Sequence, residues 1–303
     1  MTLTELAAGA GTVVLLGLCK NAGKTTALVR LIREHAAGGS AATPIGLTSV
    51  GRDGERRDLV TGTDKPPVYI YSGTLCATAE GLLPFCDVSR EILQTLEGVH
   101  TSLGRVVLFR ARSDGFVQLA GPSIVEQLTP LREAFAAHGA GQVLIDGALG
   151  RRSPAAAAGP GGCVVLSTGA SLDRDMYTVV EETAFIAGLL TLSRAASPEP
   201  GDEVIPGALT ETRAAELLRS GKKLDGLRFI ALDGSRYLLK RTTYAALKAR
   251  GARFAVERET RLAAVTVNPV SAGGWRFDAE RFLEKIRAAI GDVPALDVGR
   301  VEL

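Results

Sequence analysis

The chain has 303 residues, of which 46% are hydrophobic and 22% are charged, and its formal net charge is +2 at pH 7. This composition predicts a globular protein with one large domain or two ordinary ones. The charge is nearly balanced and no basic stretch is interleaved with aromatic residues. The sequence therefore carries no electrostatic indication of nucleic-acid binding, and we expect no nucleic-acid partner.

Membrane and metal-cluster classes are also disfavoured. No apolar stretch approaches the roughly 18 residues of a membrane-spanning helix, and the N-terminal residues lack the basic and apolar regions of a signal peptide. We therefore expect a cytoplasmic protein with no membrane association. The four cysteines form no CxxC pair and have no zinc spacing, so we expect neither a disulfide framework nor a metal cluster.

Residues 12–30 read TVVLLGLCKNAGKTTALVR. The apolar run at 13–16 predicts a strand and residues 24–37 predict a helix, with a turn of small residues between them. This order is typical of a phosphate-binding loop, in which backbone N–H groups and the helix dipole face an anion. Lys24 would contact the β- and γ-phosphates, and the Thr25 hydroxyl would bind Mg²⁺. The residues predicted to bind the nucleotide in this loop are Lys20, Asn21, Ala22, Gly23, Lys24, Thr25 and Thr26.

The loop departs from the usual pattern, because Leu18 occupies the position of its first glycine and Gly17 lies one residue earlier. Lys20 adds a second cation. This is similar to loops in the dimerising SIMIBI branch of P-loop proteins, where an early lysine contacts the partner's nucleotide, so a homodimer is one hypothesis. An ordinary strand-to-helix turn with a solvated Lys24 is the alternative. Cys19 is either a small apolar filler or a redox-sensitive thiol.

Two acidic residues follow predicted strands. The strand at 45–50 leads to Asp53, at the sheet edge where ligands bind in open α/β sheets. Asp53 is interpreted as an Mg²⁺ ligand or as the residue that orients an attacking water, with a turn former as the alternative. The strand at 142–145 ends at Asp146, whose carboxylate would bind Mg²⁺ through water. Lys24, Asp53 and Asp146 are thus the predicted catalytic residues, and Thr25, Asp53 and Asp146 the predicted metal ligands.

Strands and helices alternate along the rest of the chain. Further strands are predicted at 68–71, 106–112, 116–119, 163–169, 204–205, 229–232, 254–256, 262–267 and 295–298. Further helices are predicted at 89–96, 123–137, 172–192, 210–219, 242–249 and 277–290. We expect 106–112 and 116–119 to belong to the same sheet, and the helix at 123–137 to start at Ser123 and to bury Ile124 with its other apolar residues.

This alternation predicts an α/β fold: a three-layer, P-loop NTPase-like architecture with a mostly parallel sheet and helices on both faces. Residues 193–203 are the best linker candidate. They separate a nucleotide-binding core at 1–192 from an α/β portion at 203–303, which continues the same sheet or forms a smaller second lobe. Asn268 ends the strand at 262–267. It is interpreted as a purine contact because an amide offers both a donor and an acceptor, although Asn-Pro also starts turns.

The order of five segments is more specific than any one of them. The segments are KNAGKTT, TSVGRDGE, DLVTGTDKPPVYIYSGTLCATA, LIDGALGRRS and VTVNPVSAGGWRFD. Over most of its length the chain resembles the SIMIBI-like P-loop subunit of lysine 5,6-aminomutase reactivase. The resemblance implies an ATP-driven factor that works with a MutS-like ATPase subunit and exchanges damaged cobalamin on lysine 5,6-aminomutase. It assigns Gly23, Lys24, Thr25 and Thr26 to phosphate and Mg²⁺, and Asp53 and Asp146 as acids.

Two alternatives stay open beside this NTPase, for which ATP is preferred over GTP. The first is a metabolic enzyme of the dethiobiotin synthetase type, which activates a small carboxylate as its acyl phosphate; Arg151 or Lys20 would then neutralise the transferring phosphoryl group. The second is a degenerate site in which the nucleotide is only a structural ligand. No motif among the residues themselves points to cobalamin or to lysine.

Overall fold

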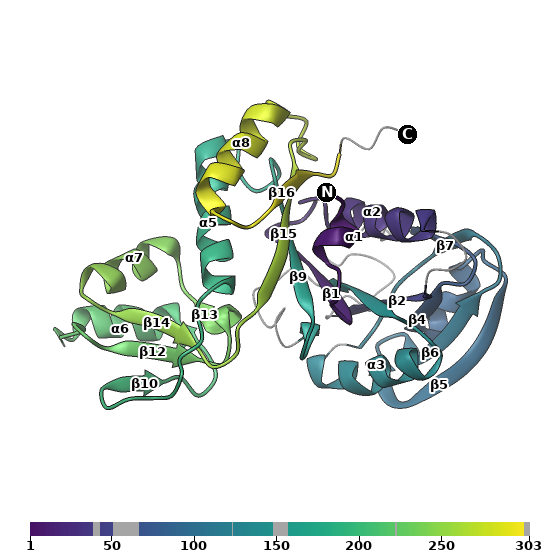
Figure 1. The fold of residues 1–303 in the computed structure, drawn as a ribbon, viewed down its shortest axis with the longest axis horizontal. Coiled ribbons are helices and arrows are strands. Elements are labelled where there is room, and N and C mark those ends of the chain that lie inside the picture. The colour runs from purple at the N-terminus through teal and green to yellow at the C-terminus, as the bar shows by residue number, and fades with distance from the viewer. Residues whose placement is uncertain (39–42, 51–66, 123, 148–156, 222, 300–303) are drawn as a thin grey trace.

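The computed structural model describes residues 1–38, 43–50, 67–122, 124–147, 157–221 and 223–299. Within these ranges, nine strands form one central sheet (Figure 1). In spatial order they are β16 (Ala295–Asp297), β15 (Arg261–Asn268), β9 (Cys163–Gly169), β1 (Thr12–Gly17), β8 (Gln142–Gly147), β2 (Ile45–Val50), β4 (Leu75–Ala79), β6 (Gly104–Ala111) and β5 (Arg90–Thr101). Every neighbouring pair from β16 to β4 is parallel, and only β6 runs the other way.

Two hydrophobic cores lie on opposite faces of this sheet. On β1, Val14 and Leu16 face one core while Val13 and Leu15 face the other, because successive side chains of a strand alternate in direction. The first core is covered by α3 (Leu128–Ala137), α5 (Met176–Leu190) and α8 (Ala279–Ile290). The second is covered by α1 (Leu3–Leu6) and α2 (Lys24–Ala37). The fold is thus α/β with a large, mostly parallel sheet, consistent with a three-layer architecture.

A smaller parallel sheet forms a second lobe, seen at the left of Figure 1. Its strands are β10 (Asp202–Val204), β12 (Arg228–Ala231) and β14 (Arg253–Val256), accompanied by α6 (Glu211–Arg219) and α7 (Arg241–Ala249). The buried Tyr237 hydroxyl lies 2.8 Å from Phe229 O and 2.6 Å from Ala255 O, so it bridges β12 and β14. Gly234 packs directly on the end of α5, because an added Cβ there would lie 1.8 Å from Leu189 O.

Short elements complete the described chain. Two small ribbons pair β3 (Val68–Ile70) with β7 (Gly115–Val117) and β11 (Leu209–Thr210) with β13 (Tyr237–Leu238). The 3-10 turns are Glu80–Phe85, Val125–Gln127 and Gly234–Arg236. Residues 203–303 thus contribute to both sheets, since β15 and β16 return to the central one. Among the described helices, none combines the length and apolar character needed to cross a membrane.

The predicted helix at 24–37 and the predicted strand at 45–50 are confirmed at both ends. The helix predicted at 89–96 is wrong, because residues 90–96 belong to β5, which pairs with β6 over most of its length. The register of β5 shifts between Ile92 and Gln94 and again between Leu96 and His100. Each irregularity interrupts the alternation of side chains, so the apolar residues lose the period of two that identifies a strand.

Two further predictions need correction. The return at 116–119 does not join the same sheet as 106–112, because β7 pairs with β3 in a separate antiparallel ribbon. The helix predicted at 123–137 begins only at Leu128, after a 3-10 turn. Ile124 is consequently 52% exposed and outside the core. Ser123, its predicted N-cap, lies outside the described residues, whereas Leu128, Leu131 and Phe135 are buried as predicted.

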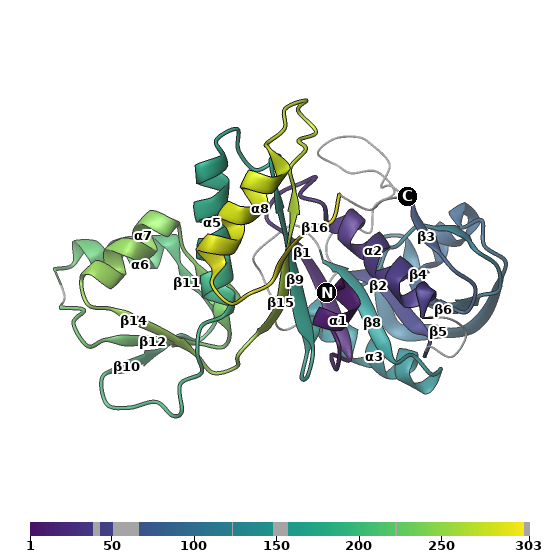
Figure 2. The same ribbon diagram turned by 45° about the horizontal axis from the view of Figure 1, so that its top comes forward.

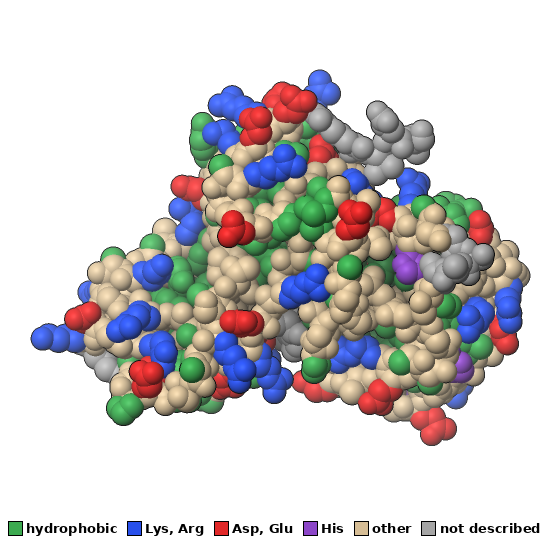
Figure 3. Space-filling model, in the orientation of Figure 1, with side chains coloured by type: hydrophobic (Ala, Val, Ile, Leu, Met, Phe, Trp, Pro, Cys, Tyr) green, Lys and Arg blue, Asp and Glu red, His purple; other side chains and the backbone are tan. Residues whose placement is uncertain are grey.

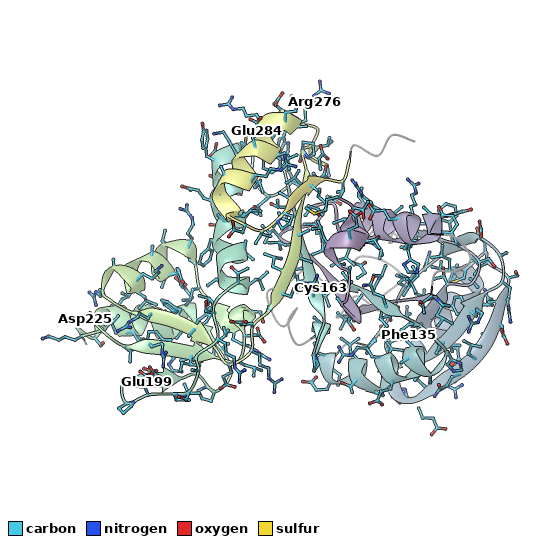
Figure 4. All side chains as sticks on the ribbon, viewed as in Figure 1. Phe135, Cys163, Glu199, Asp225, Arg276 and Glu284 are labelled. Atoms are coloured by element: carbon cyan, nitrogen blue, oxygen red, sulfur yellow. The ribbon has the colours of Figure 1, made fainter. Side chains whose placement is uncertain are left out.

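The contrast between Phe135 and Ile124 can be measured. Phe135, labelled in Figure 4, is fully buried, and a Cβ added at Gly46 would lie 2.7 Å from its ring. Phe135→Ala is expected to lower the free energy of unfolding by about 3–5 kcal/mol. Ile124→Ala is expected to change it by less than about 0.5 kcal/mol. Urea denaturation followed by circular dichroism compares the two variants, and equal losses would contradict the placement of residue 124 at the surface.

Candidate functional site

The candidate site lies where two neighbouring strands send the chain in opposite directions. β1 continues into α2 on one face of the sheet, whereas β9 leads to α5 on the other. Figure 2 shows β1, β9 and β15 side by side, with α2 on one side and α5 and α8 on the other. In open α/β sheets, ligands bind beyond the carboxyl ends of strands at such a switch in topology.

The loop between β1 and α2 contains two residues with a positive φ just before the helix starts. Asn21 has a φ of 60° and Gly23, at the N-cap of α2, has a φ of 98°. Among the described residues, no side chain caps this helix end. Because the first N–H groups of a helix have no acceptor within the helix, they and the helix dipole favour a negative group here.

Gly17 has a defined role in this geometry. A Cβ added at Gly17 would lie 2.9 Å from Lys24 Cγ, so a larger residue there would force the Lys24 side chain to shift. Gly17, which lies one position before the usual glycine of the motif, thus leaves space for the Lys24 side chain. Leu18, which takes the usual glycine position, donates its backbone N–H to Ser167 O of β9 over 3.0 Å.

Lys24 and Asp146 meet at the carboxyl edge of the sheet. Lys24 Nζ lies 3.2 Å from Asp146 Oδ1 and also donates to Gly147 O. The parallel register brings them together, because Asp146 of β8 is paired with Leu15 of β1. Their side chains are 18% and 27% exposed, respectively, so the ion pair is largely withdrawn from water. The structure therefore joins two of the three predicted catalytic residues.

Asn268 contacts the loop that carries Lys24. Its Nδ2 donates to Asn21 O over 3.1 Å, and its Oδ1 accepts the N–H of Val270 over 3.1 Å. A Cβ added at Gly23 would lie 3.2 Å from Asn268 Cβ, so the two backbones approach closely. Each polar atom of an amide has a second hydrogen or lone pair. The purine contact predicted for Asn268 therefore stays a prediction, beside an observed contact that the sequence did not predict.

Sequence reasoning missed Trp275, the single tryptophan of the chain. Its indole Nε1 donates to Ala170 O over 3.0 Å, and the Arg174 guanidinium lies 4.9 Å from its ring centre. The N–H of Ala170 donates in turn to Asn268 O over 2.9 Å. These contacts join the loops that follow β9 and β15 next to Asn268. A lone tryptophan within SAGGW after a strong strand was the available signal.

One part of the carboxyl edge is covered by the chain itself. The segment 118–122 crosses the ends of β2 and β4: Thr78 Oγ1 donates to Gln118 O over 2.7 Å, and the N–H of Gly121 donates to Ser49 Oγ over 2.9 Å. Ser49 is paired with Asp146 in the sheet register. The candidate site accordingly extends from Asp146 toward β1, β9 and β15 and not toward β4.

The remaining predicted residues occupy different positions. Thr25 is half-buried in the first turn of α2, Thr26 is exposed there, and Lys20 is half-buried in the loop. Ala22 is buried and supports the turn. Asp53, the third predicted catalytic residue, lies outside the described residues, so the structure does not test its role.

The donors at this edge fit Mg²⁺ better than a softer metal. The Thr25 hydroxyl and the Asp146 carboxylate offer hard oxygen atoms, which Mg²⁺ prefers. In the ranges that the structure describes, no group of three or more His, Cys, Asp or Glu residues could enclose a metal.

Comparisons of the chain with protein-family models, with curated proteins and with solved structures find no match. The resemblance to a reactivase subunit therefore stays a prediction made from sequence motifs. The candidate site rests on its own geometry: the Lys24–Asp146 contact, the uncapped start of α2 and the contact between Asn268 and Asn21.

Burial affects the protonation of the Cys19 thiol. The thiol lies half-buried in the loop between β1 and α2, and burial raises its pKa from 9.0 to about 11. Because the thiolate is the reactive form, a raised pKa keeps Cys19 protonated and unreactive at neutral pH. This supports the role of a small apolar filler over that of a redox-sensitive thiol.

Alkylation measures this state directly. At pH 7.5, iodoacetamide is expected to modify Cys19 roughly 100-fold more slowly in the folded protein than in urea, since each pKa unit changes the thiolate fraction about tenfold. The rate in the folded protein should keep rising until the pH passes about 11. Mass spectrometry of the Cys19 peptide follows the reaction. A rate that levels off near pH 9 in the folded protein would contradict the raised pKa.

Proposed function

We propose that this chain is a Mg²⁺-dependent P-loop nucleoside triphosphatase that binds ATP in preference to GTP. One observation carries the proposal: the Lys24 ammonium lies 3.2 Å from Asp146 Oδ1, beside the start of α2. No side chain of the described residues caps that helix end. A cation, a carboxylate and a helix N-terminus at one sheet edge match the phosphates and the metal of a Mg-nucleotide.

Each group has a stated part in hydrolysis. Lys24 would neutralise charge on the β- and γ-phosphate oxygens, and the backbone N–H groups of residues 22–25 would donate to those oxygens. Thr25 and Asp146 would hold Mg²⁺, which would supply positive charge to neutralise the charge that develops on the phosphate oxygens. Asp53 would orient the water that attacks the γ-phosphorus as the bond to the bridging oxygen breaks.

The proposed client follows from the resemblance of the sequence motifs. We infer that the chain is a subunit of a factor that exchanges damaged cobalamin on lysine 5,6-aminomutase, together with a MutS-like ATPase subunit. A homodimer with Lys20 contacting the partner's nucleotide belongs to the same proposal. Asn268 would read the purine edge with the hydrogen and the lone pair that its contacts to Asn21 and Val270 leave available.

Lys24→Ala tests the nucleotide site. The wild-type chain is expected to hydrolyse Mg-ATP slowly, and the variant should lose roughly 100-fold or more of this rate, because it lacks the cation that stabilises the phosphoryl charge. Release of phosphate measures the rate. Lys248→Ala is the matched control, since this exposed lysine lies over the Tyr244 ring in the second lobe. Equal activity of wild type and Lys24→Ala would contradict the proposal. If Asp146→Ala also leaves the rate of hydrolysis unchanged, the result would favour the alternative in which the nucleotide is only a structural ligand.

Stimulation separates the proposed client from a metabolic substrate. Hydrolysis is expected to rise on addition of a MutS-like ATPase subunit together with lysine 5,6-aminomutase, because a remodelling factor couples hydrolysis to its client. Small carboxylates should leave the rate of ADP release unchanged. Stimulation of ADP release by one carboxylate, with none by the two proteins, would instead support the dethiobiotin synthetase type.

A further inference from the structure

The two charged residues of the candidate site are bound to each other in this structure. Lys24 Nζ is held by Asp146 Oδ1 at 3.2 Å and by Gly147 O. The proposed function, on which this inference rests, requires the same two groups elsewhere: Lys24 on phosphate oxygens and Asp146 on Mg²⁺. In the proposed function, binding would move Lys24 from Asp146 to the phosphate oxygens and leave Asp146 to the metal.

The surroundings make this contact more than a chance surface pairing. Gly17 leaves the space through which the Lys24 side chain reaches the tip of β8, since an added Cβ would lie 2.9 Å from Lys24 Cγ. Both side chains are mostly buried, at 18% and 27% exposed. Charges partly removed from water attract each other more strongly and are screened less by salt than exposed ones.

Neither ATP alone nor Mg²⁺ alone can neutralise both Lys24 and Asp146, as the ion pair does. ATP without metal can accept Lys24, but the Asp146 carboxylate then faces the phosphate charge without a cation. Mg²⁺ alone can accept Asp146, but the Lys24 ammonium then faces a dication. Like charges in such a site are unfavourable. When both ligands arrive together, Lys24 exchanges a carboxylate for phosphate and Asp146 exchanges an ammonium for Mg²⁺, so no charge is left unpaired.

We propose that the Lys24–Asp146 ion pair is a latch that makes nucleotide binding conditional on Mg²⁺. The latch is closed in the structure described here, and the Mg-nucleotide opens it by taking both partners at once. The two ligands consequently bind with positive coupling. Asp146 has two parts in this scheme: it disfavours metal-free nucleotide before it serves the metal.

Asp146→Asn removes the charge of the latch while keeping the shape of the side chain. We expect calorimetric titration in EDTA to give about tenfold tighter ATP binding for Asp146→Asn than for wild type, within the range of ordinary coupling between sites. In wild type, Mg²⁺ should tighten ATP binding by about tenfold or more, whereas in the variant its effect should fall to within about threefold. Asp114→Asn is the matched control, because Asp114 lies between β6 and β7 and accepts the N–H of Ser72.

The outcomes are distinguishable. ATP binding in EDTA that is no tighter in Asp146→Asn than in wild type would overturn the latch, while tight Mg-ATP binding by wild type would leave the proposed function intact. Equal affinity of wild type for ATP with and without Mg²⁺ would also overturn the latch, and this measurement needs no variant. If wild type binds ATP neither in EDTA nor with Mg²⁺, the proposed function and the latch are both refuted.

Discussion

The register of β1 between β8 and β9 is the constraint on which the candidate site depends. Leu15 pairs with Asp146 on one side, and Gly17 pairs with Ser167 on the other. A slip of one residue would move the start of the loop by about 3.3 Å and turn each side chain of β1 to the opposite face. The two buried cores forbid such a slip, because each accepts only its own alternate residues of β1. Packing far from the edge thus sets the distance between Lys24 and Asp146.

Helix α5 connects this edge of the sheet to the second lobe. α5 begins beside the Trp275 loop, where Asp175 accepts the N–H groups of Tyr177 and Thr178. Its other end packs against Gly234, in the 3-10 turn that follows β12. Arg241, at the start of α7, forms ion pairs with Glu181 and Glu182 of α5. The second lobe therefore contacts α5 at Glu181 and Glu182 as well as at its C-terminal end. On the face seen in Figure 3, basic and acidic side chains are intermingled among the coloured residues of both parts of the molecule.

Local patterns predicted much of this arrangement. The apolar runs that form β1 and β8 end at Gly17 and at Asp146, so both strands could be predicted from the sequence. Because the carboxyl ends of parallel strands lie at one edge of a sheet, Lys24 and Asp146 could be expected close together. The strand β5 was predicted as a helix for a local reason: its register shifts break the alternation of its side chains. The contact of Asn268 with Asn21 and the cover that 118–122 forms over β2 depend on residues far apart in sequence, and no periodicity encodes such pairings. Asp53 lies outside the described residues and stays a prediction.

A crystal structure with Mg²⁺ and a non-hydrolysable ATP analogue tests the site most directly. We predict phosphates against the backbone of residues 22–25, Lys24 Nζ moved from Asp146 Oδ1 to a phosphate oxygen, and Asp146 turned to the metal or its waters. The base should lie beyond the ends of β9 and β15, near Asn268 and Trp275. A nucleotide bound elsewhere on the molecule, or phosphates in the loop with Lys24 still paired to Asp146, would contradict this assignment.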